Sequence, residues 1–224
     1  MTLAEVIPNW VPAVAAYMGQ GLLVTVYIAC ASAVASLLLG AILGVLLTFP
    51  SALVRAPIRA YVEVWRGLPN IITLFFIFFV LPAIGINVNE SLAAVIGLSL
   101  WGSANVAEIV RGSVVSISQG QYQCAFALGL NWRQAMAYVI GPQALRRTIP
   151  PTMGLLTNLI QSTALASVIG VLELVTASER SIQRLTISSG DSHAVVILGA
   201  VALIFFVVCT PLTRYARRLE QRLK

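Results

Sequence analysis

The sequence is poor in charged residues. Only 10% of its 224 residues are Asp, Glu, Lys or Arg, whereas soluble domains carry about 25%. Hydrophobic residues make up 58%. So few charges cannot cover a surface in water, and so apolar a composition is not that of a disordered chain or a disulfide scaffold. The sequence therefore predicts an integral membrane protein.

Residues suited to metal binding or acid–base chemistry are also scarce. There is one histidine, His193, and one aspartate, Asp191, and the three cysteines, Cys30, Cys124 and Cys209, lie far apart without metal-ligand spacing. One aspartate excludes an aspartyl pair, and no His-Glu-x-x-His motif is present. An intramembrane protease would depend on His193 alone. We therefore expect no catalytic residue and no metal site.

Five apolar segments are long enough to cross a bilayer core of about 30 Å, which takes about 20 helical residues. They do not alternate apolar and polar residues, as the strands of a membrane barrel do. The start of the chain lacks the basic residues of a secretory signal, so we expect the first span to be retained. The sequence predicts an all-α membrane protein with one domain over 1–224 and five spans at about 17–48, 59–82, 91–110, 148–170 and 193–212. Pro211 and an arginine-rich tail are expected to end the last span.

The basic residues predict the orientation. The net charge is +6, and all of the Lys and Arg residues except Arg180 and Arg184 fall within 55–66, 111–147 and 214–224. These three segments lie on one side of a five-span chain. The positive-inside rule then places the N-terminus outside and the C-terminus in the cytoplasm. We interpret the basic character in this way, and not as a sign of nucleic-acid binding.

Two Glu-x-x-Arg-Gly patterns occur near the predicted cytoplasmic ends of adjacent helices. Glu63 precedes Arg66 by three residues, and Glu108 precedes Arg111 by the same spacing. Side chains three apart share one helix face and can pair. We favour two structural ion pairs at the membrane edge over a direct role in a substrate pathway.

The predicted fourth span is unusually polar. Thr157 and Gln161, like Asn158 and Ser162, are four residues apart, and Thr163 follows. Such a helix face cannot point at lipid without leaving hydrogen bonds unmet. It either packs against other helices or lines a wet cavity, and both alternatives stay open. The candidate pathway residues are Asn158, Gln161, Ser162 and Thr163.

The predicted cytoplasmic segment 121–147 indicates two short helices with a break at Gly129. Asn131 suits the N-cap of the second helix, and Leu128 and Tyr138 would expose apolar area to water. An apolar patch there indicates a protein partner, although the segment could instead fold back onto the membrane domain. On the outer side, 168–185 has the spacing of a short amphipathic helix.

These segments together resemble the membrane subunit of ATP-binding-cassette importers in the polar amino-acid permease family. The segment 121–150 is similar to the family's EAA loop: Ala125, Gly129 and Pro142 match, whereas Gln123 and Cys124 replace the usual Glu and Ala. The likeness covers about 17–218, and further similar segments are 61–82, 107–129 and 163–170.

The resemblance implies the type I importer fold, with the loop seated as coupling helices on a cytoplasmic ATPase dimer. The residues expected to couple to the ATPase are Gln123, Ala125, Leu128, Gly129, Asn131, Trp132 and Arg133. It also implies a second permease subunit, either the same chain or a sister chain, and an extracytoplasmic substrate-binding protein. The protein would be a multi-pass permease for polar amino acids in the lipid of the bacterial cytoplasmic (inner) membrane.

The sequence has no Gly-x-x-x-x-Gly-Lys-[Ser/Thr] phosphate loop. ATP and Mg are therefore expected on the partner, and this chain is expected to bind no cofactor and no nucleic acid. The alternative is a subunit of a secondary transporter or channel for small polar solutes. Such a protein would need no apolar docking loop, and a carrier usually has acids in mid-span, whereas Glu63 and Glu108 lie near the inner edge.

Overall fold

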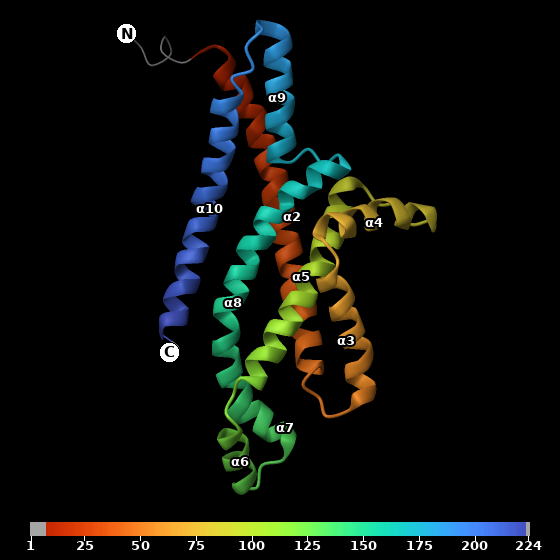
Figure 1. Ribbon diagram of the computed structural model, residues 1–224, viewed down its shortest axis with the longest axis vertical. Coiled ribbons are helices and arrows are strands. Elements are labelled where there is room, and N and C mark those ends of the chain that lie inside the picture. Colours follow the sequence, from red (N-terminus) through yellow and green to blue (C-terminus); the bar gives the residue numbers. More distant parts are fainter. Residues whose placement is uncertain (1–7, 223–224) are drawn as a thin grey trace.

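The computed structural model describes residues 8–222, which form an elongated bundle of helices (Figure 1). The first residues, to which the expectation about a secretory signal applies, lie mostly outside this range. Every regular element of the described chain is helical. By length and composition, four helices can cross a membrane, or five if the bent pair α3–α4 counts as one span.

The centre of the bundle is the pair formed by α2 (Trp10–Leu46) and α5 (Glu90–Val115), which make the most extensive helix contact. Small residues four apart on α2 allow this close approach: Ser32, Ser36, Gly40 and Gly44 are all buried. A Cβ atom built on Gly40 would lie 2.5 Å from the Cβ of Val106. The two backbones are therefore too close for a larger side chain.

The predicted second span is two helices in the structure. α3 (Ala52–Gly67) and α4 (Asn70–Ala83) meet at an angle of 107°, and α4 projects sideways from the bundle (Figure 1). Leu68 is extended, with φ −84° and ψ 135°, because the ring of a following proline disfavours helical geometry. The Leu68–Pro69 step thus divides a segment whose apolar composition predicts one helix.

The helical segment that contains the predicted fourth span begins before residue 148 and changes its winding twice. After α6 (Gln119–Ala127) and the short α7 (Trp132–Ala135), a π-helical turn, η1 (Met136–Ile140), leads into α8 (Gly141–Ser162). A 3₁₀ helix, η2 (Thr163–Ile169), follows and ends at Gly170, whose φ is +90°. Positive φ is readily adopted by glycine, so the chain can turn there.

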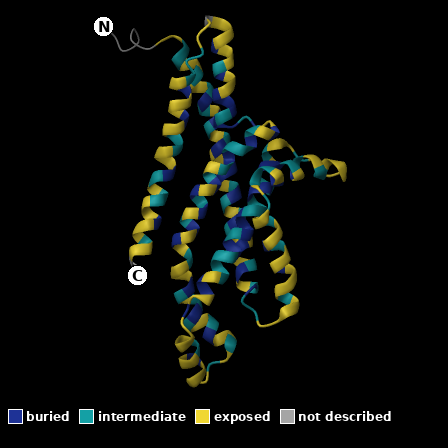
Figure 2. Ribbon diagram, viewed as in Figure 1, coloured by how far each residue is buried: buried dark blue, intermediate teal, exposed yellow. Residues whose placement is uncertain are grey.

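The outer helix and the last span complete the fold. α9 (Leu174–Ser189) packs on α2, and α10 (Ala194–Arg222) packs on α8 and α9. Pro211 lies inside α10, and the helix continues through the arginine-rich tail to Arg222. Burial is concentrated around α2, α5 and η2, whereas α4 and α10 are exposed over much of their length (Figure 2).

Candidate functional site

The turn between α6 and α7 is built as the sequence predicts. Gly129 has φ +79°, and Asn131 caps α7. The Asn131 Oδ1 accepts a hydrogen bond from the Gln134 backbone N–H at 3.0 Å, while the Gln134 Oε1 accepts one from the Asn131 N–H at 2.9 Å. This reciprocal capping box satisfies two backbone donors at the helix start. The turn is thereby fixed by local chemistry.

The loop is anchored to the ends of α5 and α8. Arg147 Nη1 donates to the Ser116 carbonyl at 2.6 Å and to its Oγ at 3.0 Å. Gln143 Nε2 donates to Gln121 Oε1 at 3.1 Å. Tyr122 is partly buried against α5, and this burial raises the pKa of its phenol. These hydrogen bonds connect α6 to α8, and α8 to the end of α5.

The predicted coupling residues divide into an inward and an outward set. Ala125 is buried, at 1% exposure, and packs within the loop, and Trp132 is half-buried with its ring 5.2 Å from that of Phe49. Gln123, Leu128, Gly129, Asn131 and Arg133 are exposed. Two apolar residues share this exposure: Leu128 is 80% exposed and Tyr138 is 75% exposed.

The polar residues of α8 and η2 also divide into a buried set and an exposed set. Thr157 and Thr163 are buried, and each donates its hydroxyl proton to a carbonyl of its own helix, Met153 at 3.1 Å and Ile160 at 2.7 Å. Asn158 and Gln161 are exposed in the single chain. The Gln161 side chain also lies near the Cys209 thiol of α10.

Ser162 has a partner that sequence reasoning missed. Its Oγ accepts a hydrogen bond from Asn70 Nδ2 at 3.2 Å, across 92 positions of the chain. Asn70 is the first residue of α4, directly after the break at Pro69. A polar residue following Leu-Pro inside an apolar segment is a signal in the sequence that could have indicated this position.

The structure corrects one of the two expected ion pairs. Among the described residues, Glu63 pairs with Arg59 at 3.3 Å, and Arg66 donates instead to Asn105 Oδ1 of α5 at 3.3 Å. Glu108 and Arg111 do pair: Arg111 Nε donates to Glu108 Oε2 at 2.8 Å, and Nη2 donates to Oε1. The three-residue spacing thus leads to a pair on α5 but not on α3, where Asn105 competes for the arginine.

A buried carboxylate fixes the outer helix. Glu173, 0% exposed, accepts hydrogen bonds from the backbone N–H groups of Val175 and Thr176, both at 2.8 Å. Burial raises the pKa of this carboxyl group in spite of these bonds. The Leu174 N–H donates to Thr25 Oγ1 of α2 at 3.0 Å. The junction of η2 and α9 is therefore bound directly to the central helix.

Within residues 8–222, no group of three or more His, Cys, Asp or Glu side chains is placed so that it could hold a metal ion. The arrangement is instead that of a helical membrane domain with an anchored, partly apolar loop at one end. Near the middle of this domain, the polar end of α8 lies beside the break between α3 and α4.

Comparison with known proteins defines the class. Residues 36–224 match the family described as binding-protein-dependent transport system inner membrane component. The chain belongs to this family and is a multi-pass permease subunit of the cytoplasmic membrane. It is not an enzyme, and ATP hydrolysis is carried by a separate subunit.

Several relatives are named as amino-acid permeases. The chain is 36% identical over 208 residues to the probable glutamine ABC transporter permease protein GlnP of Bacillus subtilis, covering 92% of this chain and 94% of that protein. It is 33% identical over 207 residues to the glutamine transport system permease protein GlnP of Escherichia coli K12, covering 92% of each. It is 34% identical to the L-cystine transport system permease protein TcyB of Bacillus subtilis, covering 83% of this chain and 81% of that protein.

Solved structures share the fold. The structure described as an amino acid ABC transporter with histidines superposes with a TM-score of 0.82 at 26% identity, covering 96% of this chain and 99% of that one. An inward-facing MetNI methionine ABC transporter superposes with a TM-score of 0.72 at 18% identity, covering all of both chains. The second likeness concerns the fold alone. The all-helical fold of an ABC importer permease, expected from the sequence, is thus confirmed.

Proposed function

We propose that the chain imports polar amino acids as the membrane-spanning subunit of an ATP-driven, binding-protein-dependent transporter. The observation that carries the proposal is the anchored α6–η1 loop. Its exposed Leu128 and Tyr138 lie at the end of the bundle where the basic residues place the cytoplasm. Exposed apolar area at such a site suits a protein partner, and a secondary transporter or channel would need none.

In this proposal the loop docks on an ATPase dimer, with Gln123, Leu128, Gly129, Asn131 and Arg133 at the contact. Ala125 packs inside the loop, and Trp132 contacts Phe49 beyond the end of α2. Nucleotide-driven closure of the ATPase pulls on the loop, and Arg147 and Gln143 transmit the pull to α5 and α8. The helices then shift between inward-open and outward-open states, a two-state element biased by the partner.

The proposed pathway is the face of α8 that presents Asn158, Gln161 and Ser162, with Asn70 beside it. A zwitterionic amino acid needs hydrogen bonds for its ammonium and carboxylate groups, because burying an unmet charge costs several kcal/mol or more. Amide and hydroxyl groups supply such bonds without a fixed charge that would hinder release. Thr163 supports this face from within η2. A second permease subunit, either this chain or a sister chain, would close the path on the other side.

Transport in proteoliposomes tests the proposal. The permease is reconstituted with its ATPase and candidate binding proteins, and uptake of labelled amino acids is screened, beginning with glutamine and cystine. We expect uptake that requires ATP and a binding protein. Uptake driven by an ion gradient without ATP would favour the secondary transporter.

One substitution tests the pathway. Gln161→Leu should reduce uptake or change the substrate preference more than it lowers the amount of assembled complex. The control is Gln183→Leu, on the exposed side of α9. If complex and uptake fall in the same proportion, Gln161 acts only through its contact with Cys209 of α10, and the pathway assignment is wrong.

The orientation, with the N-terminus outside and the C-terminus in the cytoplasm, can be tested by thiol labelling in intact cells. In a variant without native cysteines, single cysteines are placed at Asn87 and Arg217, both exposed. A membrane-impermeant reagent should label position 87 and miss position 217. Labelling of position 217 from outside would overturn the orientation.

A further inference from the structure

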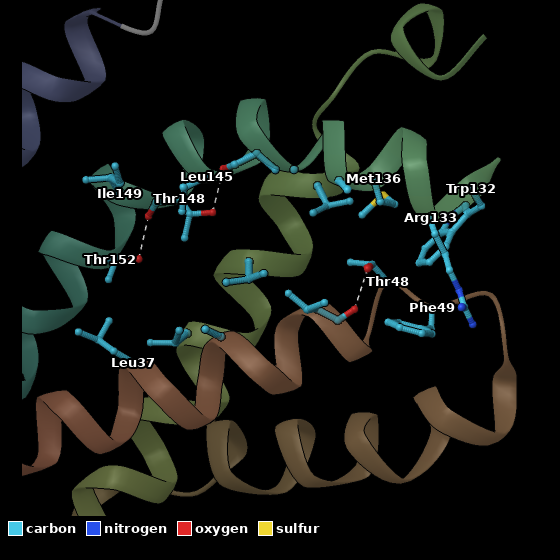
Figure 3. Close-up of a pocket in the computed structure, with 18 of the residues that line it drawn as sticks. Leu37, Thr48, Phe49, Trp132, Arg133, Met136, Leu145, Thr148, Ile149 and Thr152 are labelled. Carbon is cyan, nitrogen blue, oxygen red and sulfur yellow. Dashed lines mark hydrogen bonds between the residues drawn. The ribbon is translucent and has the colours of Figure 1, made fainter. Parts of the chain in front are cut away.

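An apolar groove of about 640 Å³ lies on the flank of the bundle, between the lower half of α2, α5 and the segment from α7 to α8. Figure 3 shows Leu37 and Ile149 toward one end, and Phe49, Trp132 and Arg133 at the other. Its volume is within the range of about 300–1,000 Å³ that is usual for small-molecule sites. The groove is separate from the polar face of α8.

The groove wall is hydrocarbon in character even where it contains threonine. Thr48 donates its hydroxyl proton to the Val45 carbonyl at 2.7 Å, Thr148 to Ala144 at 2.9 Å, and Thr152 to Thr148 at 2.7 Å. Each hydroxyl is thus used within its own helix (Figure 3). Away from Trp132 and Arg133 at the mouth, the hydroxyl protons of this wall are thus not available to a polar amino acid, whereas an acyl chain requires no donor.

A second pocket of about 490 Å³ adjoins the groove and shares Thr48 and Val114 with it. Three arginines line this pocket: Arg55, Arg59 and Arg111. Arg59 is paired with Glu63 and Arg111 with Glu108. Within residues 8–222, no ion pair involves Arg55 or, at the groove mouth, Arg133. The two pockets together therefore combine a long apolar surface with a cationic end.

The dimensions match one leaflet of a bilayer. The groove follows α2 from Leu37 to Val45, which is about 12 Å at the rise of an α-helix, and it continues past the end of the helix to Thr48 and Phe49. Half of the hydrocarbon core is about 15 Å. The cationic pocket then lies at headgroup depth, on the side where the arginines of this chain gather. Basic pockets between membrane helices on that side attract anionic headgroups.

We propose that the groove and the arginine pocket bind one anionic glycerophospholipid of the cytoplasmic leaflet. An acyl chain lies along Leu37, Val45, Val106 and Ile149, and the phosphate lies against Arg55, with Arg59 and Arg111 nearby. The bound lipid fills the space between α2 and the start of α8, next to the Phe49–Trp132 contact. This site is additional to the transport function proposed above and does not depend on the substrate.

Native mass spectrometry of the full chain tests the proposal. The chain is reconstituted in nanodiscs with equal amounts of phosphatidylglycerol and phosphatidylcholine of the same acyl chains, and retained lipid is counted after release. We expect one phosphatidylglycerol retained in preference to phosphatidylcholine. Arg55→Gln should lower this preference by about fivefold, the effect of one basic residue near a headgroup, and the control Arg217→Gln should leave it unchanged.

A second pair of variants tests the acyl chain. Ala41 lines the groove, whereas Leu38, one turn earlier on α2, is exposed and lies outside it. Ala41→Phe should displace the retained lipid, and Leu38→Phe should not. Equal retention of both lipids, equal effects of the two Phe variants, or competition by free glycerol phosphate would overturn the proposal. Loss of permease dimers in Ala41→Phe with unchanged lipid retention would instead assign the groove to a second copy of the chain.

Discussion

The two ends of the bundle hold their short helices in opposite ways. The α6–η1 loop is anchored by exposed hydrogen bonds and leaves Leu128 and Tyr138 in the open. α9 buries its apolar side against α2 and presents charged residues outward, among them Glu179, Arg180 and Arg184. Obligate interfaces are more apolar than transient ones. Under the proposed function, the α6–η1 loop would meet an ATPase that stays bound, and α9 would lie on the side of a binding protein that dissociates.

The largest effect, a loss of ATPase binding, is expected when a charge is placed in the exposed apolar part of the α6–η1 loop. Leu128→Asp places a carboxylate in the proposed docking contact and should weaken co-purification of the ATPase by about 30-fold or more, the effect of losing a hot-spot side chain of about 2 kcal/mol. Ile187, 87% exposed on α9, is the matched position at the other end. Ile187→Asp should leave ATPase binding intact. Equal losses in both variants would show that the two ends do not differ.

The next effect tests the outer end. Glu173→Ala removes the acceptor of the buried Thr176 N–H and of the partly buried Val175 N–H, and an unsatisfied buried donor costs about 1–3 kcal/mol. We expect earlier thermal unfolding and faster proteolysis within α9, measured on the purified chain. Glu179→Ala, at an exposed position of the same helix, is the control. If both variants have the same unfolding temperature and the same rate of proteolysis as the wild type, the buried carboxylate does not fix α9.

The turn at Gly129 is expected to have a smaller energetic effect but a specific functional one. A β-branched residue at φ +79° is strained by about 1 kcal/mol or more. Gly129→Val should insert in the membrane normally but lower the ATP hydrolysis that is stimulated by the binding protein. Gly129→Asn is the matched control, since asparagine tolerates this conformation. Normal stimulated hydrolysis in Gly129→Val would mean that the turn geometry does not serve coupling.

The sequence predicts well what local chemistry decides. The Gly129–Asn131 turn follows from two residue preferences, and the helical class follows from composition. The stripe Ser32, Ser36, Gly40 and Gly44 has the four-residue spacing of close-packed membrane helices, so the α2–α5 contact was also readable but was missed. The Leu68–Pro69 break was hidden by the apolar residues around it.

Contacts between distant segments could not be predicted in the same way. Arg66 bonds to Asn105 because α3 packs on α5, and Asn70 reaches Ser162 because the bend between α3 and α4 turns α4 toward η2. Both depend on the angle between helices, which the apolar pattern does not specify. Pro211 likewise shows that a proline inside a long apolar helix need not end it, because only the bond of its missing N–H is lost directly.

The smallest effect is a pH dependence that belongs to the outer end alone. Burial raises the pKa of Glu173 in the folded chain above its ordinary value, and the nearby charge of Glu179 adds a minor contribution in the same direction. The folded state thus holds the proton more tightly than the unfolded state does. The stabilising contribution of Glu173 is therefore complete below the pKa that this carboxyl group has in the unfolded chain. It is lost as the pH rises through the pKa of the group in the folded chain.

The melting temperature of the purified wild-type chain should therefore fall more between about pH 4 and pH 7 than that of Glu173→Gln, which cannot titrate there. The measurement is the difference between the two melting curves across this range, with Glu179→Gln as the exposed control. Because Gln still offers one carbonyl acceptor to the start of α9, the variant should unfold cooperatively at every pH. A difference that does not change with pH would mean that the carboxylate keeps one protonation state throughout, so that hydrogen bonding alone accounts for its role.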